Sequence, residues 1–310
     1  MNRMIRNMIS TKDGLVIFLD NQVHKLVTGL NVRFLQEISK HGTSNPIVAR
    51  LGPQVKDLCG FYNLTDEQKG EIFDIMSNKV CRHCLECYDI FKKIETKIVE
   101  IDAQIGKKGL DLQSNGRVVT LPSVPNLVAD AENFLYKAKS ALRDLTNIFR
   151  VLFDINCKET EKNLYQCILE QLKEKFGEND NLIKQLSEDY KLWIKELVAK
   201  RNAVEHPGGY SGRLYIKDCS YEEYEGRKGI IIPTWHRDSD KPTSILHDMS
   251  SYIHNIFTFA EEIFILSLQK CKPLVDVPMH IAKIPESERS KDMPVRFRMV
   301  MDHDAKGNSL

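Results

Sequence analysis

Apolar residues recur every three or four positions over much of this chain, a spacing that predicts amphipathic helices. The longest such pattern follows an N-terminal helix signal at Thr65 and Gln68 and continues for about nine turns before Gly106 and Gly109 interrupt it. Its apolar positions are Phe73, Met76, Val80, Cys84, Cys87, Phe91, Ile94, Ile98, Ile101 and Ile105. We expect one long packing or coiled-coil helix here, within an N-terminal helical region that covers residues 1–105.

A second block of helical patterns follows a polar segment rich in glycine and proline, residues 106–123, which is the clearest linker in the chain. Four helices are predicted in this block, over residues 126–155, 161–177, 181–206 and 243–270. Two short strands, RLYIKD and GIIIPTW, predict a hairpin at about residues 213–235. The last residues, 272–310, are expected to form an extended C-terminal tail with one strand, VRFRMVM. The predicted fold class is therefore mostly α, with a helical domain over residues 124–271.

The third helix of this block ends in a group of polar residues, directly before Pro207. At about 100° per residue, Arg201 falls close to the middle of the buried stripe, where a guanidinium needs a carboxylate, a cavity or a partner chain. Glu205, four residues further on, is the nearest carboxylate. Arg201 and His206 lie about 140° apart on a continuous helix, so they converge only if the helix ends before His206 or if two chains supply them. The first is favoured, because a residue that precedes proline is pushed out of the helical conformation.

The helix end therefore predicts a positive, proton-donating pocket, since the helix dipole favours the protonated form of a histidine at a C-terminus. Its motif, Arg201-Asn202-x-x-x-His206, resembles that of the HEPN superfamily of all-α domains. The order of helix, short helix, motif helix and final helix over residues 124–271 is also similar. The resemblance implies a HEPN-like four-helix bundle, from which the inserted hairpin departs. Residues 1–105 and the tail have no counterpart in it.

Many HEPN proteins are metal-independent endoribonucleases that act as dimers, with two copies of the motif facing each other. The resemblance implies that His206 takes part in proton transfers around the 2′-hydroxyl and the leaving oxygen, and that Arg201 holds the scissile phosphate. Asn202 would orient this pair, and Glu205 would support Arg201. The resemblance further implies RNA as substrate, no cofactor or metal, a homodimer, and a toxin or antiviral-defence setting with a neutralising antitoxin as partner.

Other HEPN domains have no activity and serve as scaffolds or nucleotide-binding modules, so a fold of this kind does not decide the function. In that alternative, Arg201 and Glu205 form an ion pair that fixes the helix end, and His206 is only a C-terminal cap. Both interpretations stay open at the level of the sequence.

Three basic residues, Lys139, Arg143 and Arg150, share the solvent face of the first helix in the second block. Such a stripe fits an RNA backbone. Glu132 and Asp154 lie on the same side, which favours a mixed, solvated surface instead.

The sequence CRHCLECYD places Cys81, His83, Cys84 and Cys87 within seven residues, all of them zinc-type ligands. Structural zinc sites usually draw two such pairs from separate segments, and the chain has no second CxxC. Cys84 and Cys87 also fall on the apolar seam of the long helix, which favours buried structural thiols and no metal site.

Composition adds little to this picture. Lys and Arg number 44 against 43 Asp and Glu, a net charge of +1 that neither demands nor excludes RNA. The N-terminal apolar run is too short for a signal peptide, and other apolar stretches carry charges and fall short of a membrane span. We therefore expect a cytoplasmic protein without membrane contact, whose eight cysteines are reduced thiols.

Overall fold

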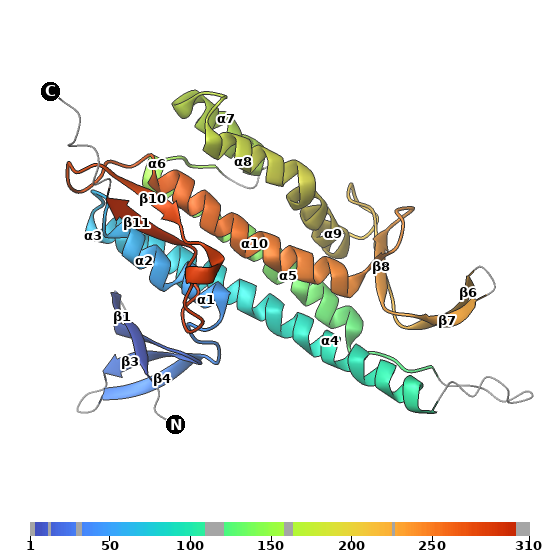
Figure 1. Cartoon of the computed structure of the whole chain (residues 1–310). Helices are drawn as coiled ribbons and strands as arrows, with labels where there is room; N and C mark the ends of the chain where they lie inside the picture. Colours follow the sequence, from blue (N-terminus) through green and yellow to red (C-terminus); the bar gives the residue numbers. More distant parts are fainter. Residues whose placement is uncertain are drawn as a thin grey trace, which may run out of the picture. The chain divides into compact units, whose positions relative to one another are not determined.

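The computed structural model of the chain describes residues 4–11, 14–28, 33–108, 121–157, 164–224 and 227–301. About 55% of these residues are helical and about 20% lie in strands, which form four separate sheets (Figure 1). The protein is therefore of mixed α/β class. The prediction of a mostly α protein, with a HEPN-like four-helix bundle and an inserted hairpin, is wrong. The linker predicted at residues 106–123 lies mainly outside the described residues.

Two compact units make up the chain. The first combines Met1–Leu85, Ala141–Asp189 and Phe257–Leu310, and the second combines Glu86–Ser140 and Tyr190–Ile256. Over the described ranges, no helix combines the length with the apolar character that crossing a bilayer requires.

The first unit opens with an antiparallel sheet where the sequence pattern predicts helix. Its strands pair in chain order, β1 (Ile5–Thr11), β2 (Gly14–Leu19), β3 (Val23–Thr28) and β4 (Arg33–Ser39). One face buries Ile9, Val16, Phe18 and Val23, which belong to paired positions on neighbouring strands. Successive side chains of a strand point to opposite faces, so this burial follows a period of two. The predicted helical character of residues 1–105 is therefore wrong for the part that forms these strands.

The helices of the first unit are short, apart from those that also contribute to the second. They are α1 (Pro46–Leu51), α2 (Pro53–Cys59), α3 (Asp66–Phe73), α6 (Asn147–Phe153), α7 (Leu164–Phe176) and α8 (Asn181–Asp189). Thr65 caps α3 as predicted, because its side chain accepts a hydrogen bond from the backbone nitrogen of Gln68. The amide oxygen of Gln68 in turn accepts one from the backbone nitrogen of Thr65, at 3.0 Å.

The predicted long helix is confirmed. From α3 the chain continues through a π-helical segment, η1 (Asp74–Cys81), into α4 (Arg82–Lys108). Most of the predicted apolar seam is buried: Phe73, Met76, Val80, Cys84, Cys87, Ile94, Ile98 and Ile101. The helix thus owes its length to a stripe of apolar residues that water does not reach.

In the second unit, α5 (Leu127–Leu145) packs along α4. Lys137 lies 2.9 Å from the Glu86 carboxylate, and the Cys87 thiol donates to the Phe134 carbonyl at 3.7 Å. The predicted hairpin is more elaborate than two strands. A sheet of β5 (Leu214–Lys217), β8 (Thr234–Arg237) and β9 (Thr243–Ser244) precedes α10 (Ile245–Leu268), and a separate pair joins β6 (Ser220–Tyr224) to β7 (Arg227–Ile231).

The C-terminal part of the first unit is an antiparallel pair of strands, β10 (Met279–Lys283) and β11 (Phe297–Met301). The predicted strand in VRFRMVM is confirmed, but its pairing makes the segment a sheet, not an extended tail. The side-chain oxygen of Gln54 on α2 accepts hydrogen bonds from the backbone nitrogens of Arg296 at 2.6 Å and Phe297 at 2.9 Å. This buried amide therefore ties the start of β11 to the helices.

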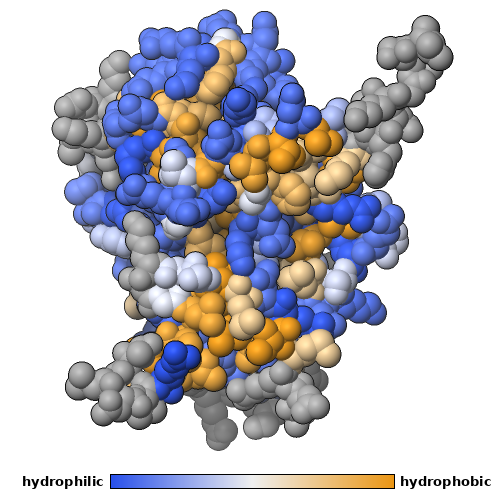
Figure 2. All heavy atoms as spheres, turned by 90° about the vertical axis from the view of Figure 1, so that its left-hand side faces the viewer, coloured by the Kyte–Doolittle hydropathy of each residue, from blue (hydrophilic) through white to orange (hydrophobic). Residues whose placement is uncertain are grey.

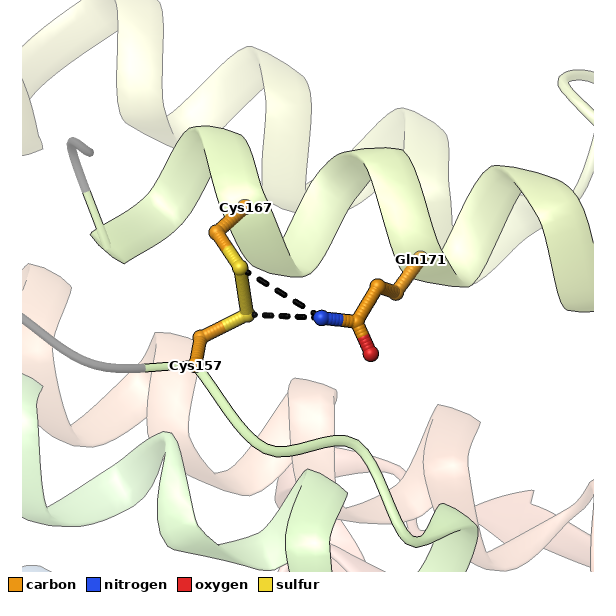
Figure 3. The surroundings of a disulfide bond; sticks show 3 residues. All are labelled: Cys157, Cys167 and Gln171. Atoms are coloured by element: carbon orange, nitrogen blue, oxygen red, sulfur yellow. Dashed lines mark hydrogen bonds between the residues drawn. A yellow bond between two sulfur atoms is a disulfide. The ribbon is translucent and has the colours of Figure 1, made fainter. Parts of the chain in front are cut away.

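Cys157 and Cys167 form a disulfide, with Gln171 beside it (Figure 3). The amide nitrogen of Gln171 lies 3.2 Å from the sulfur of Cys157 and 3.4 Å from that of Cys167. The expectation that all cysteines are reduced thiols is therefore wrong for these two. The other six are free, and Cys59, Cys81, Cys84 and Cys87 among them are buried.

Replacing Cys157 by serine is expected to lower the free energy of unfolding by about 2–3 kcal/mol, because the bond no longer restricts the unfolded chain. The loop is short, with the two cysteines 10 positions apart. Urea unfolding followed by circular dichroism measures the change. The matched control is Cys271→Ser, a half-buried free thiol of the same unit, which we expect to change stability much less. An identical unfolding curve for the parent with and without reductant would contradict the disulfide's role.

Candidate functional site

The candidate site lies at the C-terminal end of α9 (Lys195–Glu205), in the second unit. A short π-helical segment, η2 (Tyr190–Ile194), leads into this helix. The helix ends at Glu205, since His206 has φ −128° and ψ 71°, although its backbone nitrogen still donates to the Asn202 carbonyl at 2.8 Å. Gly208 then adopts φ +80°, a conformation that favours glycine and turns the chain away. The predicted helix end before His206 is confirmed.

Arg201 is paired and largely buried, as its place on the helix predicts. Its side chain is 12% exposed, and its guanidinium forms an ion pair with Glu205. One hydrogen bond of that pair joins Nη2 to the Glu205 carboxylate at 2.9 Å. The guanidinium also lies over the ring of Tyr136, with its carbon 4.5 Å from the ring centroid, a favourable cation–π geometry. Its Nε is buried and has no hydrogen-bond partner among the described residues.

His206 meets Arg201 through the same carboxylate. The imidazole Nε2 lies 3.6 Å from Oε2 of Glu205, the oxygen that also faces the guanidinium. The histidine side chain is 73% exposed, so water or a ligand reaches it freely. Because the helix ends before His206, two residues that would diverge on a continuous helix converge within one chain.

Helix α5 supplies the opposite side of the site. The ammonium of Lys139 lies 3.4 Å from the side-chain oxygen of Asn202, which also lies 3.5 Å from Nη1 of Arg201. The Tyr136 hydroxyl donates to Glu205 at 3.4 Å. We call these six residues the polar cluster: Tyr136, Lys139, Arg201, Asn202, Glu205 and His206. Three of them carry or accept positive charge, so the cluster suits an anionic ligand.

The three residues of the predicted basic stripe have different neighbours. Lys139 joins the polar cluster, and Arg143 lies one turn further along the same helix, α5. Nη2 of Arg143 lies 3.3 Å from Oδ1 of Asp144, and Arg150 forms an ion pair with Glu71. Each of these arginines thus has an acidic neighbour, which weakens its attraction for a phosphate backbone.

The cysteine-rich stretch behaves as buried structure. Burial raises the pKa of the Cys81 thiol to about 12, and it also raises that of Cys87. Nε2 of His83 lies 3.3 Å from the Asp144 carboxylate. Within the part of the chain that the structure describes, no group of three or more histidine, cysteine or acidic side chains is arranged to hold a metal ion. The interpretation as buried thiols is confirmed.

Lys200 is a buried cation that the sequence pattern does not reveal. Its side chain is 7% exposed, and its ammonium donates to Glu196 at 2.9 Å and to the Tyr252 hydroxyl on α10 at 3.3 Å. It also lies 5.8 Å from the ring of Trp235 on β8. The next residue is Arg201, so burial of Lys200 fixes the rotation of α9 and directs Arg201 toward α5.

A second arginine completes this arrangement. Arg237 at the end of β8 donates to Glu196 at 2.9 Å and to the Ser211 carbonyl at 3.3 Å. Burial opposes ionisation of Glu196, but hydrogen bonds and charges from Lys200 and Arg237 outweigh it and hold its pKa below the usual 4.5. These contacts attach the loop after α9 to the helix that carries the polar cluster.

Stability should therefore depend on pH through Glu196. Because its pKa is lowered in the folded state, its contribution is present above the unfolded value and is lost as the pH falls through the folded one. We expect the melting temperature of the parent to fall more steeply between about pH 5 and pH 3 than that of Glu196→Gln. Thermal unfolding over this range measures the difference. Glu132→Gln, which removes a half-buried carboxylate from α5, is the control, and parallel profiles for parent and Glu196→Gln would contradict the prediction.

No protein-family model matches this sequence, and comparisons with curated proteins and with solved structures found no significant match. The chemistry of the polar cluster therefore has to be judged from its own geometry.

Proposed function

We propose that the polar cluster is the active site of a metal-independent endoribonuclease of the HEPN type, which cleaves RNA by attack of the 2′-hydroxyl. One observation carries this proposal: Arg201 and His206, five positions apart, converge on the carboxylate of Glu205 at a helix end. A guanidinium and an exposed imidazole that contact the same carboxylate place an anion-binding group beside a proton-transfer group. Phosphodiester cleavage needs both groups.

His206 is the group for proton transfer. Its imidazole takes the proton of the 2′-hydroxyl, whose oxygen then attacks the adjacent phosphorus. The bond from phosphorus to the 5′-oxygen breaks, and that oxygen receives a proton from an imidazolium. The products are a 2′,3′-cyclic phosphate and a free 5′-hydroxyl. The Glu205 carboxylate lies 3.6 Å from Nε2 of this imidazole.

Arg201 binds the scissile phosphate and stabilises the charge that develops on its oxygens. Without RNA, the guanidinium is paired with Glu205, so a phosphate has to replace part of this pair. The fork geometry of a guanidinium favours a bidentate contact with phosphate oxygens. Lys139 adds a second cation, and Asn202 fixes the position of both through its side-chain oxygen.

A second copy of the chain belongs to this proposal, since two opposed motifs supply a base and an acid at the same time. Membership of the HEPN superfamily, a toxin or antiviral-defence setting with an antitoxin partner, and action on RNA in the cytoplasm belong to it as well. The superfamily and the defence setting are implied by the motif, and the cytoplasmic location by the short, charged apolar stretches of the sequence.

The alternative is a non-catalytic interaction module. One observation favours it: Arg201 is already neutralised by Glu205 and stacked on Tyr136, as expected of a stable helix end. In this case the exposed His206 takes part in no proton transfer, and the polar cluster only joins α9 to α5.

Incubation of the purified protein with a broad panel of RNAs in EDTA decides between the two. The nuclease is expected to cleave without metal and to leave 2′,3′-cyclic phosphate ends, which resist ligation and are detected by mass spectrometry. Absence of cleavage over the whole panel, or cleavage that EDTA abolishes, would rule out the proposed reaction.

A further inference from the structure

Strand β4, at the edge of the N-terminal sheet, exposes apolar side chains that RNA cleavage by the polar cluster does not explain. The strand consists of Arg33, Phe34, Leu35, Gln36, Glu37, Ile38 and Ser39, and all of these residues except Ser39 are exposed. Phe34 is 57% exposed, Leu35 61% and Ile38 46%. The lower part of the surface in Figure 2, on the side where β1 to β4 lie in Figure 1, shows hydrophobic side chains gathered together. Exposed apolar groups on an edge strand mark a surface that another strand can cover.

The two edges of this sheet differ. At β1, the Lys56 ammonium donates to the Met8 carbonyl at 2.8 Å, and an irregularity between Ile5 and Asn7 interrupts the pairing. Both features protect an edge against further strands. At β4, backbone pairing within the described residues involves β3 alone, from Val23–Ser39 to Thr28–Arg33. This ladder also has an irregularity, beside Ile38, but its register is regular from Arg33 to Glu37. The outward N–H and C=O groups of β4 are thus available for a ladder with one more strand.

The sequence of β4 is complementary to itself in the antiparallel direction. When two copies pair about Leu35, Leu35 lies opposite Leu35 of the second copy. Arg33 then lies opposite Glu37, Glu37 opposite Arg33, and Phe34 opposite Gln36. Arg33, Leu35 and Glu37 share one face of the sheet, because they alternate along the strand. Oxygen Oε2 of Glu37 accepts from Gln22 at 2.7 Å, which leaves the other oxygen for the arginine.

We propose that β4 is a self-association edge, where two copies of this chain pair their β4 strands antiparallel about Leu35 and form one continuous eight-stranded sheet. The apolar row continues across the junction, because Leu35 pairs with Leu26 on β3 and Leu26 with Leu15 on β2. Two Arg33–Glu37 pairs, one on each side of the two-fold axis, fix the register. This interface lies in the first unit and does not depend on RNA cleavage by the polar cluster.

Cross-linking of the full-length chain tests the register directly. In the proposed pairing, Leu35→Cys brings two thiols opposite each other, where side chains of paired strands are about 5 Å apart, close enough for a disulfide. The matched control is Ile38→Cys, a similarly exposed position whose two copies lie about 20 Å apart in this register. With a mild oxidant, Leu35→Cys is expected to form a cross-linked dimer, while Ile38→Cys and the parent do not. Equal cross-linking at both positions, or none at Leu35→Cys, overturns the proposal.

Charge reversal tests the same interface without new thiols. Arg33→Glu places like charges opposite each other at two positions and is expected to weaken this association at least about tenfold in sedimentation equilibrium. Glu37→Arg should do the same. The double variant Arg33→Glu/Glu37→Arg restores both attractive pairs and should return to within about threefold of the parent. A parent that shows no self-association up to about 100 µM overturns the proposal, as does a double variant as weak as the single ones. If the parent is monomeric, the exposed edge of β4 would instead be a binding surface for a strand of another protein.

Discussion

Replacing His206 by alanine is expected to lower the rate of RNA cleavage about 10²- to 10⁴-fold, the usual effect of removing a general acid or base. The side chain is 73% exposed, so its loss should leave the fold intact. Arg201→Ala should lower the rate about 10²- to 10³-fold, because the phosphate then loses its main positive contact. Arg201→Lys should restore little, since an ammonium cannot form the bidentate contact. Single-turnover cleavage of a labelled RNA measures each rate.

A matched histidine control is available on α10. His247 is exposed and lies in the same unit as the polar cluster, but it is not one of its members. His247→Ala should cleave RNA like the parent and should melt at a similar temperature. Undiminished cleavage by both His206→Ala and Arg201→Ala would remove the polar cluster from the reaction, even if the protein proves to be a nuclease.

Mixing the two inactive variants shows whether the active site is shared between chains. If each site takes Arg201 from one copy and His206 from the other, a mixed dimer contains one intact site. Random mixing of equal amounts of Arg201→Ala and His206→Ala should then recover about a quarter of the parent activity. No recovery would mean that each chain provides both residues of its own site, as their common contact with Glu205 in a single chain allows.

The long helix and the helix end at His206 were predictable because their determinants are local. The apolar seam from Phe73 to Ile101 repeats with the helical period over many turns, and a single buried face explains it. The end of α9 depends on Pro207, which restricts the residue before it. The pair of Arg201 and Glu205 needs only a spacing of four on a helix.

The N-terminal sheet was not predictable in this way. Residues Gly14–Leu19 form an almost continuous apolar run, in which a period of two cannot be separated from a helical one. Residues in β1 to β4 form strands because these segments pair with one another, and the residue pattern within one segment does not reveal that pairing. The same holds for β10, whose partner β11 begins well after it along the chain. Local periodicity therefore assigned too much helix.

Parts of the candidate site were hidden for a related reason. A count of about 100° per residue assumes a regular α-helix, whereas the segment that leads into α9, η2, is π-helical. The sequence pattern also did not indicate that Lys200 faces the core beside Trp235 and Tyr252. Tyr136 lies under Arg201 because α5 packs against α9, a contact between segments that are far apart in the sequence. Its spacing of three from Lys139 indicates only that the two side chains share a face of α5.

The largest effect on stability is expected at Glu261 on α10, in the first unit. Its carboxylate is fully buried and accepts hydrogen bonds from Nε of Arg50 at 2.9 Å and from the Gln54 amide at 2.8 Å. Nε of Arg296 lies 3.0 Å from its other oxygen. Burial lowers the pKa of Arg50 despite its bonds to Glu261, a sign of how costly the site is for a charge. Two arginines thus depend on one buried carboxylate, which links α1 and β11 to the core.

Glu261→Ala should therefore lower the free energy of unfolding by about 3–5 kcal/mol, because it leaves two cations without their shared carboxylate in a site that excludes water. The neighbouring residue is a matched control: Glu262 is 31% exposed and pairs with Arg296 at 2.5 Å. Glu262→Ala should cost less than about 1 kcal/mol, since solvent screens that pair.

Replacing the whole group by apolar residues, as in Arg50→Met/Glu261→Leu/Arg296→Met, should recover much of the loss, because no charge remains buried. Urea unfolding of all three variants measures these differences, and a Glu261→Ala variant as stable as Glu262→Ala would show that water reaches the cluster and relieves its charges.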